Sequence, residues 1–223
     1  MQNTLLIVHP ETTYDQVHRT REDIIRVLGA HASDRVFVLE NSNETVKYLN
    51  CETPLRTVLS SSGEIADMQF LDDLLHECGT CTIIGHTGNC CHHTAFEAVL
   101  RRFVTSPGSE ITILLPSSAI SSGNSMDMGN PMSDDIFRIE REMPDGWVLQ
   151  KLGAYRHYRS FSKGFFSVLL SRKELATLMA FVEYVCPVLF VAEEICAEIS
   201  IDGRVVGEST PQSKKLRLAL LST

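Results

Sequence analysis

Short apolar runs alternate with longer segments of helical periodicity over the first 120 residues of the chain. The runs are too short for helices and are bounded by turn residues, so they predict strands. The segments between them carry apolar residues three and four positions apart, as amphipathic helices do. Strands are expected over residues 4–8, 36–39, 55–59, 81–85 and 111–115, and helices over residues 14–30, 44–49, 65–77 (ended by Gly79) and from about residue 90. This alternation predicts a three-layer α/β fold with a mainly parallel sheet flanked by helices.

The second half of the chain has a different pattern. Residues 121–133 are rich in Ser, Gly, Asn and Met and predict a loop, and a turn signal at residues 143–146 predicts a β-hairpin from residues 136–140 and 147–152. A helix is expected over residues 171–185 and a strand over 188–192, followed by a hairpin around Asp202-Gly203 and an edge strand over 216–221. We therefore expect one domain, residues 1–223, with an insertion over about 121–168 and a C-terminal hairpin extension over about 195–223. A separate fold for residues 124–223 is the alternative.

Composition narrows the classes of function. The net charge of -8 argues against a nucleic-acid-binding protein, which needs clustered Lys and Arg. No apolar run reaches the roughly 20 residues that span a bilayer, so we expect no membrane partner and a cytoplasmic location. Seven cysteines, an odd number in a chain of 223 residues, predict reduced thiols rather than a disulfide framework. No cofactor is expected.

The candidate site lies in the turn after the strand at residues 81–85. Polar and reactive residues follow that strand where a helix is expected to begin, and the carboxyl ends of strands are where open α/β sheets build their sites. A thiol at a helix N-terminus has a lowered pKa because the helix dipole favours the thiolate. The candidate nucleophiles are Cys90 and, as second choice, Cys91; the candidate binding residues for a small-molecule ligand are His86, Thr87, Gly88, Asn89 and His92.

The segment from Cys90 to Ala98, CCHHTAFEA, resembles the nucleophile segment of the isochorismatase-like cysteine hydrolases, a family that includes nicotinamidases and other amidases. Family members have a strand ending in glycine, a turn with threonine, the nucleophilic cysteine, and then Thr-Ala and an acidic-Ala pair on the next helix. Residues 70–75 are similar to the preceding helix of the family, and the resemblance covers residues 4–120 and 171–193. It implies a cysteine hydrolase acting on C–N bonds, with Cys90 as the nucleophile and frequent assembly into homo-oligomers.

The chain departs from the family at two positions. The family has a catalytic aspartate at the end of the first strand, where this chain has His9, and a lysine after the third strand, where it has Ser60, Ser61 and Ser62. Either His9 replaces the aspartate and takes the proton of Cys90, which imidazole can do near neutral pH, or the fold persists without the activity, as a ligand-binding, metal-binding or assembly protein.

Zinc binding is a third interpretation of the cysteines. Cys78 and Cys81 have C-x-x-C spacing, and His86, Cys90 and His92 follow. However, a five-residue strand of about 16 Å separates the two groups, which is too far for one tetrahedral ion, so no metal ligand is assigned. The aromatic and basic segment over residues 155–166 is expected to form a subunit contact or to cover an anionic substrate.

Overall fold

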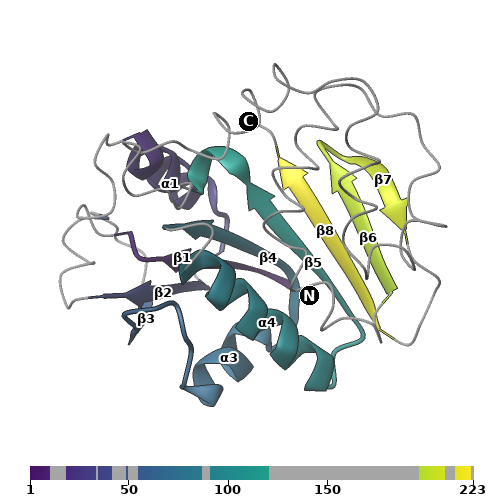
Figure 1. Ribbon diagram of the computed structural model, residues 1–223, viewed down its shortest axis with the longest axis horizontal. Coiled ribbons are helices and arrows are strands. Elements are labelled where there is room, and N and C mark those ends of the chain that lie inside the picture. The colour runs from purple at the N-terminus through teal and green to yellow at the C-terminus, as the bar shows by residue number, and fades with distance from the viewer. Residues whose placement is uncertain are drawn as a thin grey trace, which may run out of the picture.

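The chain folds as a three-layer α/β structure in which helices cover both faces of one sheet, as the computed structural model in Figure 1 shows. Helix α1 lies above the strands in that view, and helices α3 and α4 lie below them. The helices are α1 (Arg19–Ala30), α3 (Met68–Leu75), α4 (His93–Thr105) and the short 3-10 turn η2 (Ser117–Ala119). The structure describes residues 1–10, 19–33, 35–41, 49, 55–86, 91–120, 196–208 and 214–221.

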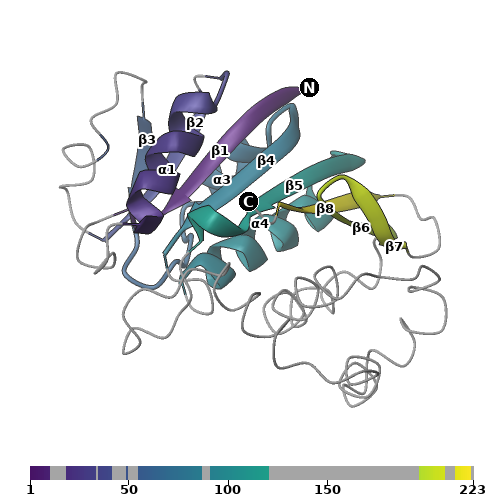
Figure 2. The ribbon, with the colours of Figure 1, turned by 90° about the horizontal axis from the view of Figure 1, so that it is seen from above.

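The sheet of the described residues has eight strands in the order β3-β2-β1-β4-β5-β8-β6-β7 (Figures 1 and 2). All neighbouring pairs are parallel except the last, in which β7 runs antiparallel to β6. The strands are β1 (Gln2–Val8), β2 (Val36–Glu40), β3 (Leu55–Leu59), β4 (Cys78–Gly85), β5 (Glu110–Pro116), β6 (Cys196–Ile201), β7 (Arg204–Glu208) and β8 (Lys215–Leu221). The expected fold class is therefore confirmed.

Two apolar layers hold the sheet. Under α1, the core joins Ile24 and Leu28 of the helix to alternate residues of three strands, namely Leu5, Ile7, Val36, Val38 and Ile84. On the other face, the ring of Phe70 in α3 meets the ring of Phe37 in β2 edge to face, with centroids 5.2 Å apart. The period-2 alternation of side chains lets one strand serve both layers.

The predicted strands of the first half are confirmed, but the bounds of the helix expected over 65–77 are wrong. Helix α3 begins at Met68 because the carboxylate of Asp67 caps it, accepting from the amides of Gln69 and Phe70. It ends at Leu75, and Gly79 lies inside β4 instead of ending the helix. The helix expected over 14–30 is observed from Arg19, and residues 11–18 lie outside the described residues.

The C-terminal hairpin is confirmed. Asp202 and Gly203 take φ angles of 47° and 81°, the left-handed pair that a two-residue turn needs. The prediction that residues 216–221 form an edge strand is wrong, because β8 lies between β5 and β6 and β7 is the outermost strand. The hairpin expected within the insertion, the helix over 171–185, the strand over 188–192 and the segment 155–166 lie outside the described residues, as does the helix over 44–49 apart from Leu49.

Candidate functional site

The order of the strands reverses between β1 and β4, and this position defines the candidate site. From β1 the chain continues outward to β2 and β3 and then returns to form β4 on the other side of β1. In open α/β sheets, ligands bind beside the carboxyl ends of the strands at such a switch point. His9 follows β1 and His86 follows β4, so two imidazoles flank the switch point directly.

His9 is held in a defined protonation state. Its side chain has no exposed surface, and its Nε2 lies 2.6 Å from the backbone oxygen of Ser60, beyond the end of β3. A carbonyl oxygen only accepts hydrogen bonds, so Nε2 carries the hydrogen, and Nδ1 is the proton-accepting nitrogen of the neutral ring. His9 also has a left-handed φ of 47°, a backbone conformation that costs free energy in a residue other than glycine.

His86 and His92 complete a group of three buried imidazoles. The amide of His86 donates to the backbone oxygen of Val8 at 2.8 Å, which fixes the chain beside the end of β1. Nε2 of His92 lies 3.3 Å from the oxygen of Ile83 and donates to it. Burial, and then the nearby rings of His9 and His92, lower the pKa of His86 to about 4, so His86 is neutral at pH 7 and acts through hydrogen bonds rather than charge.

Cys91 reaches the same edge of the sheet through a close backbone contact. It is 7% exposed, and with His92 it forms the wide π-type turn that precedes α4. Gly63, in the loop after β3, has a φ of +79°, and a Cβ there would lie 2.0 Å from the backbone oxygen of Cys91. Only glycine permits this approach. The loop after β3, which contains Ser60, is thereby held against the start of α4.

The structure thus brings together four of the eight residues expected in the site: His9, His86, Cys91 and His92. The other four, Thr87, Gly88, Asn89 and the candidate nucleophile Cys90, lie outside the described residues.

Sequence reasoning missed Glu40, the last residue of β2. It is 6% exposed and ends the strand next to His9, whose amide donates to the oxygen of the preceding residue, Leu39. Among the described residues, Oε2 of Glu40 and Oγ of Ser60 have no hydrogen-bond partner. Buried polar atoms in this state are unusual and are found at ligand sites. The available signal was a single charge closing an otherwise apolar strand, VFVLE, at its carboxyl end.

The C-x-x-C pair lies far from this group. Cys78 begins β4 and His86 follows the end of the same eight-residue strand, so the two lie at opposite edges of the sheet. Within the described ranges, no three His, Cys, Asp or Glu side chains are placed to hold a metal ion. None of the helices in this part of the chain is long and apolar enough to cross a membrane.

Comparison with known proteins adds no assignment. No protein-family model, curated protein or solved structure matches the chain. The argument about function therefore depends on the geometry of the strand ends.

Proposed function

We propose that the protein is a thiol-dependent hydrolase of a small amide or related carbonyl compound, a divergent relative of the isochorismatase-like cysteine hydrolases. Cys90, or Cys91 in its place, attacks the carbonyl carbon. His9 accepts the thiol proton, and backbone amides of the turn after His86 stabilise the oxyanion. The observation that carries the proposal is the buried His9 at the switch point, with Nε2 committed to the oxygen of Ser60 and Nδ1 as the basic nitrogen.

The surroundings of His9 support its role as a base. The hydrogen bond to Ser60 selects one tautomer and orients the ring, as a third group does in catalytic triads. Glu40, which ends the neighbouring strand, supplies a buried carboxylate at the same edge. A neutral His86 beside His9 adds no positive charge that would oppose protonation of His9.

Thiol reactivity tests the proposal directly. Brief treatment with iodoacetamide near pH 7, followed by peptide mapping, is expected to label Cys90 or Cys91 faster than the other cysteines of the chain, apart from Cys78, which is treated below. The experiment is repeated in C78S so that labelling at that position does not obscure the result. Uniformly slow labelling of Cys90 and Cys91 in both proteins would refute the proposal and favour the alternative of a non-catalytic ligand-binding protein.

The variant His9→Gln separates the base from the scaffold. The glutamine amide can still donate to the oxygen of Ser60 but has no basic nitrogen. We expect H9Q to fold, to lose the fast alkylation, and to hydrolyse any small amide found as a substrate about 10²- to 10⁴-fold more slowly. The matched control is His76→Gln, an exposed histidine at the other edge of the sheet, which is expected to retain both properties. Equal alkylation rates in H9Q and the wild type would contradict the role of His9.

Cytoplasmic location and homo-oligomer formation belong to the same proposal. Both stay predictions from the sequence and from the resemblance. Size-exclusion chromatography with light scattering tests the oligomeric state, and a monomer across micromolar concentrations would contradict it.

A further inference from the structure

A second cysteine group lies at the opposite, amino-terminal edge of the sheet. Along the β1–β4 ladder, Gln2 pairs with Cys78 and Thr4 pairs with Cys81, and a bulge at Gly79 accounts for the additional residue on β4. Gln2 and Thr4 are two positions apart on β1 and therefore face the same side. The bulge places Cys78 and Cys81 on one face, although a spacing of three would put them on opposite faces of a regular strand.

The two thiols contact each other and have different surroundings. The Cys81 thiol hydrogen-bonds the Cys78 sulfur, and Thr4 and Arg35 also lie against it. Arg35 is fixed there, since its Nε donates to Oγ1 of Thr4 at 3.2 Å and its Nη2 donates to backbone oxygens at the end of α3. The hydrogen bond from Cys81 is the main cause that lowers the pKa of Cys78 to about 7, although burial opposes it. The pKa of Cys81 is raised, first by that same hydrogen bond and then by burial.

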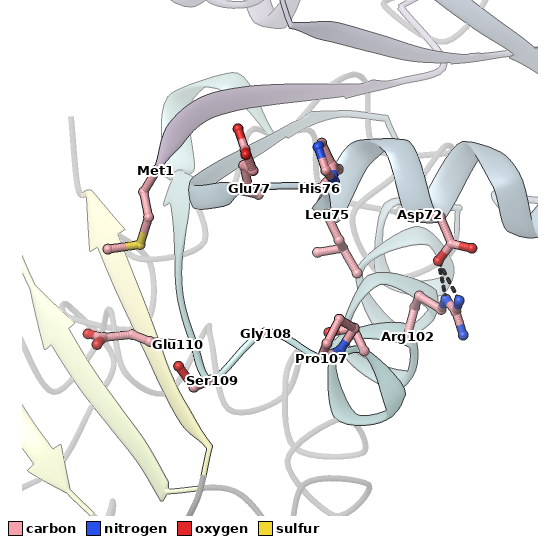
Figure 3. A pocket seen from close by; sticks show the side chains of 12 residues that line it. Met1, Asp72, Leu75, His76, Glu77, Arg102, Pro107, Gly108, Ser109 and Glu110 are labelled. Carbon is pink, nitrogen blue, oxygen red and sulfur yellow. Dashed lines mark hydrogen bonds and ion pairs between the residues drawn. The ribbon is translucent and has the colours of Figure 1, made fainter.

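Only Cys78 borders a cavity. A cleft of about 660 Å³ lies between the end of α3, the end of α4 and the loop that leads into β5, and Cys78 is part of its wall whereas Cys81 is fully buried. Figure 3 shows charged groups of both signs around the cleft, including Glu77, Arg102 and Glu110. A cleft of this size and charge suits a small zwitterionic thiol compound carrying ammonium and carboxylate groups.

We propose that Cys78 and Cys81 form a redox-active dithiol that low-molecular-weight disulfides, entering the cleft, convert to an intrachain disulfide. The Cys78 thiolate attacks one sulfur of the small disulfide, a mixed disulfide forms, and one small thiolate leaves. Cys81 then loses its proton and attacks the Cys78 sulfur, which forms the Cys78–Cys81 bond and releases the second small thiolate. The two electrons that the protein loses reduce the small disulfide to two thiols.

The order of the two attacks follows from the structure. Cys78 is reachable from the cleft and Cys81 is not, so the first bond forms at Cys78. Once Cys78 is in a mixed disulfide, its negative charge is gone, and two of the causes that raise the pKa of Cys81 disappear with it.

The register also sets how strained the product is. Two residues of β1 separate the partners of Cys78 and Cys81, a span of about 6.6 Å. That span is close to the upper limit of about 6.8 Å for the Cα atoms of a disulfide. The intrachain bond should form and should also be readily reduced. This site is independent of the proposed hydrolase activity, because it lies at the other end of β4.

Oxidised glutathione and three proteins test the proposal: the full-length wild type, C81S and C78S. After acid quenching, intact mass and non-reducing peptide maps are recorded. The wild type is expected to lose two hydrogens within the peptide that holds both cysteines, C81S to accumulate one glutathione on Cys78, and C78S to leave Cys81 unmodified. A lasting mixed disulfide at Cys78 in the wild type, modification of Cys81 in C78S, or no reaction at Cys78 would overturn the proposal.

A pH profile provides a readout that packing alone would not change. Alkylation of Cys78 is followed against pH in the wild type and in Cys81→Ala, which also serves if C81S does not fold. The midpoint is expected near 7 in the wild type and near the ordinary thiol value of about 8.5 in C81A, because the hydrogen-bond donor is lost. An unchanged midpoint would refute the coupling of the two thiols.

Discussion

Replacement of His86 by glutamine tests whether the strand ends hold neutral imidazoles. Burial and the rings of His9 and His92 lower the pKa of His86 to about 4 in the folded protein, from an ordinary value of 6.5. Because the folded-state pKa is the lower one, the unfolded chain binds a proton at a pH where the folded chain does not. The contribution of a neutral His86 to stability is therefore complete above about pH 6.5 and is lost as the pH falls towards 4.

The size of this effect follows from the same values. Each pH unit between the two pKa values changes the free energy of unfolding by about 1.36 kcal/mol, so the whole window of about 2.5 pH units is worth about 3 kcal/mol. Between pH 7.0 and pH 4.5, we expect the wild type to lose about 2 kcal/mol more stability than H86Q.

Urea denaturation followed by far-ultraviolet circular dichroism at the two pH values measures this difference. H86Q itself destabilises the fold, so the comparison needs a variant that is destabilised without loss of a titrating group. Leu100→Ala in α4, where Leu100 is fully buried, serves as that control and is expected to keep the pH dependence of the wild type. If H86Q lost as much stability as the wild type on acidification, the conclusion that His86 is neutral in the folded protein would be wrong.

Two further substitutions test local features of the fold. Gly63→Ala is expected to cost at least 1–3 kcal/mol, roughly the strain of a left-handed residue alone, because its Cβ would also meet the backbone of Cys91. Gly29→Ala, a helical glycine with nothing within 4 Å, is the control and should stabilise by about 1 kcal/mol. Asp67→Ala should cost about 1 kcal/mol through loss of the α3 cap, whereas Asp67→Asn should keep most of it. Thermal and urea denaturation measure all four, and equal stability within either pair would contradict the assigned role.

The fold class could be predicted from sequence because it depends on local periodicity. The strands of the first half alternate with amphipathic segments, and this pattern alone implies a parallel sheet. The bounds of α3 depend instead on two features that periodicity does not show. These are the side-chain cap of Asp67 at its start and the guanidinium of Arg35 at its end, which comes from the turn before β2.

The candidate site was predictable in position but not in composition. Residues that follow strands, such as His9 and His86, can be placed at one edge from the chain order alone. The burial of Glu40 and the contact between His9 and Ser60 depend on the lateral order of β1, β2 and β3, which no local pattern encodes. The bulge at Gly79 was missed for a related reason, since the glycine resembled a helix terminator and its role is set by pairing with β1.

The interior position of β8 has a consequence for biosynthesis. Strands β1 to β5 come first in the sequence and can pair with one another as soon as residues up to 116 are available. The β6–β7 hairpin is synthesised next but has no place on the sheet, because β8, made last of the three, separates it from β5. Until β8 arrives, the nascent chain presents the open edge of β5 and a detached hairpin, both of which can pair with other chains. A stop codon just before residue 215 would therefore cost the protein three strands, although it deletes only one.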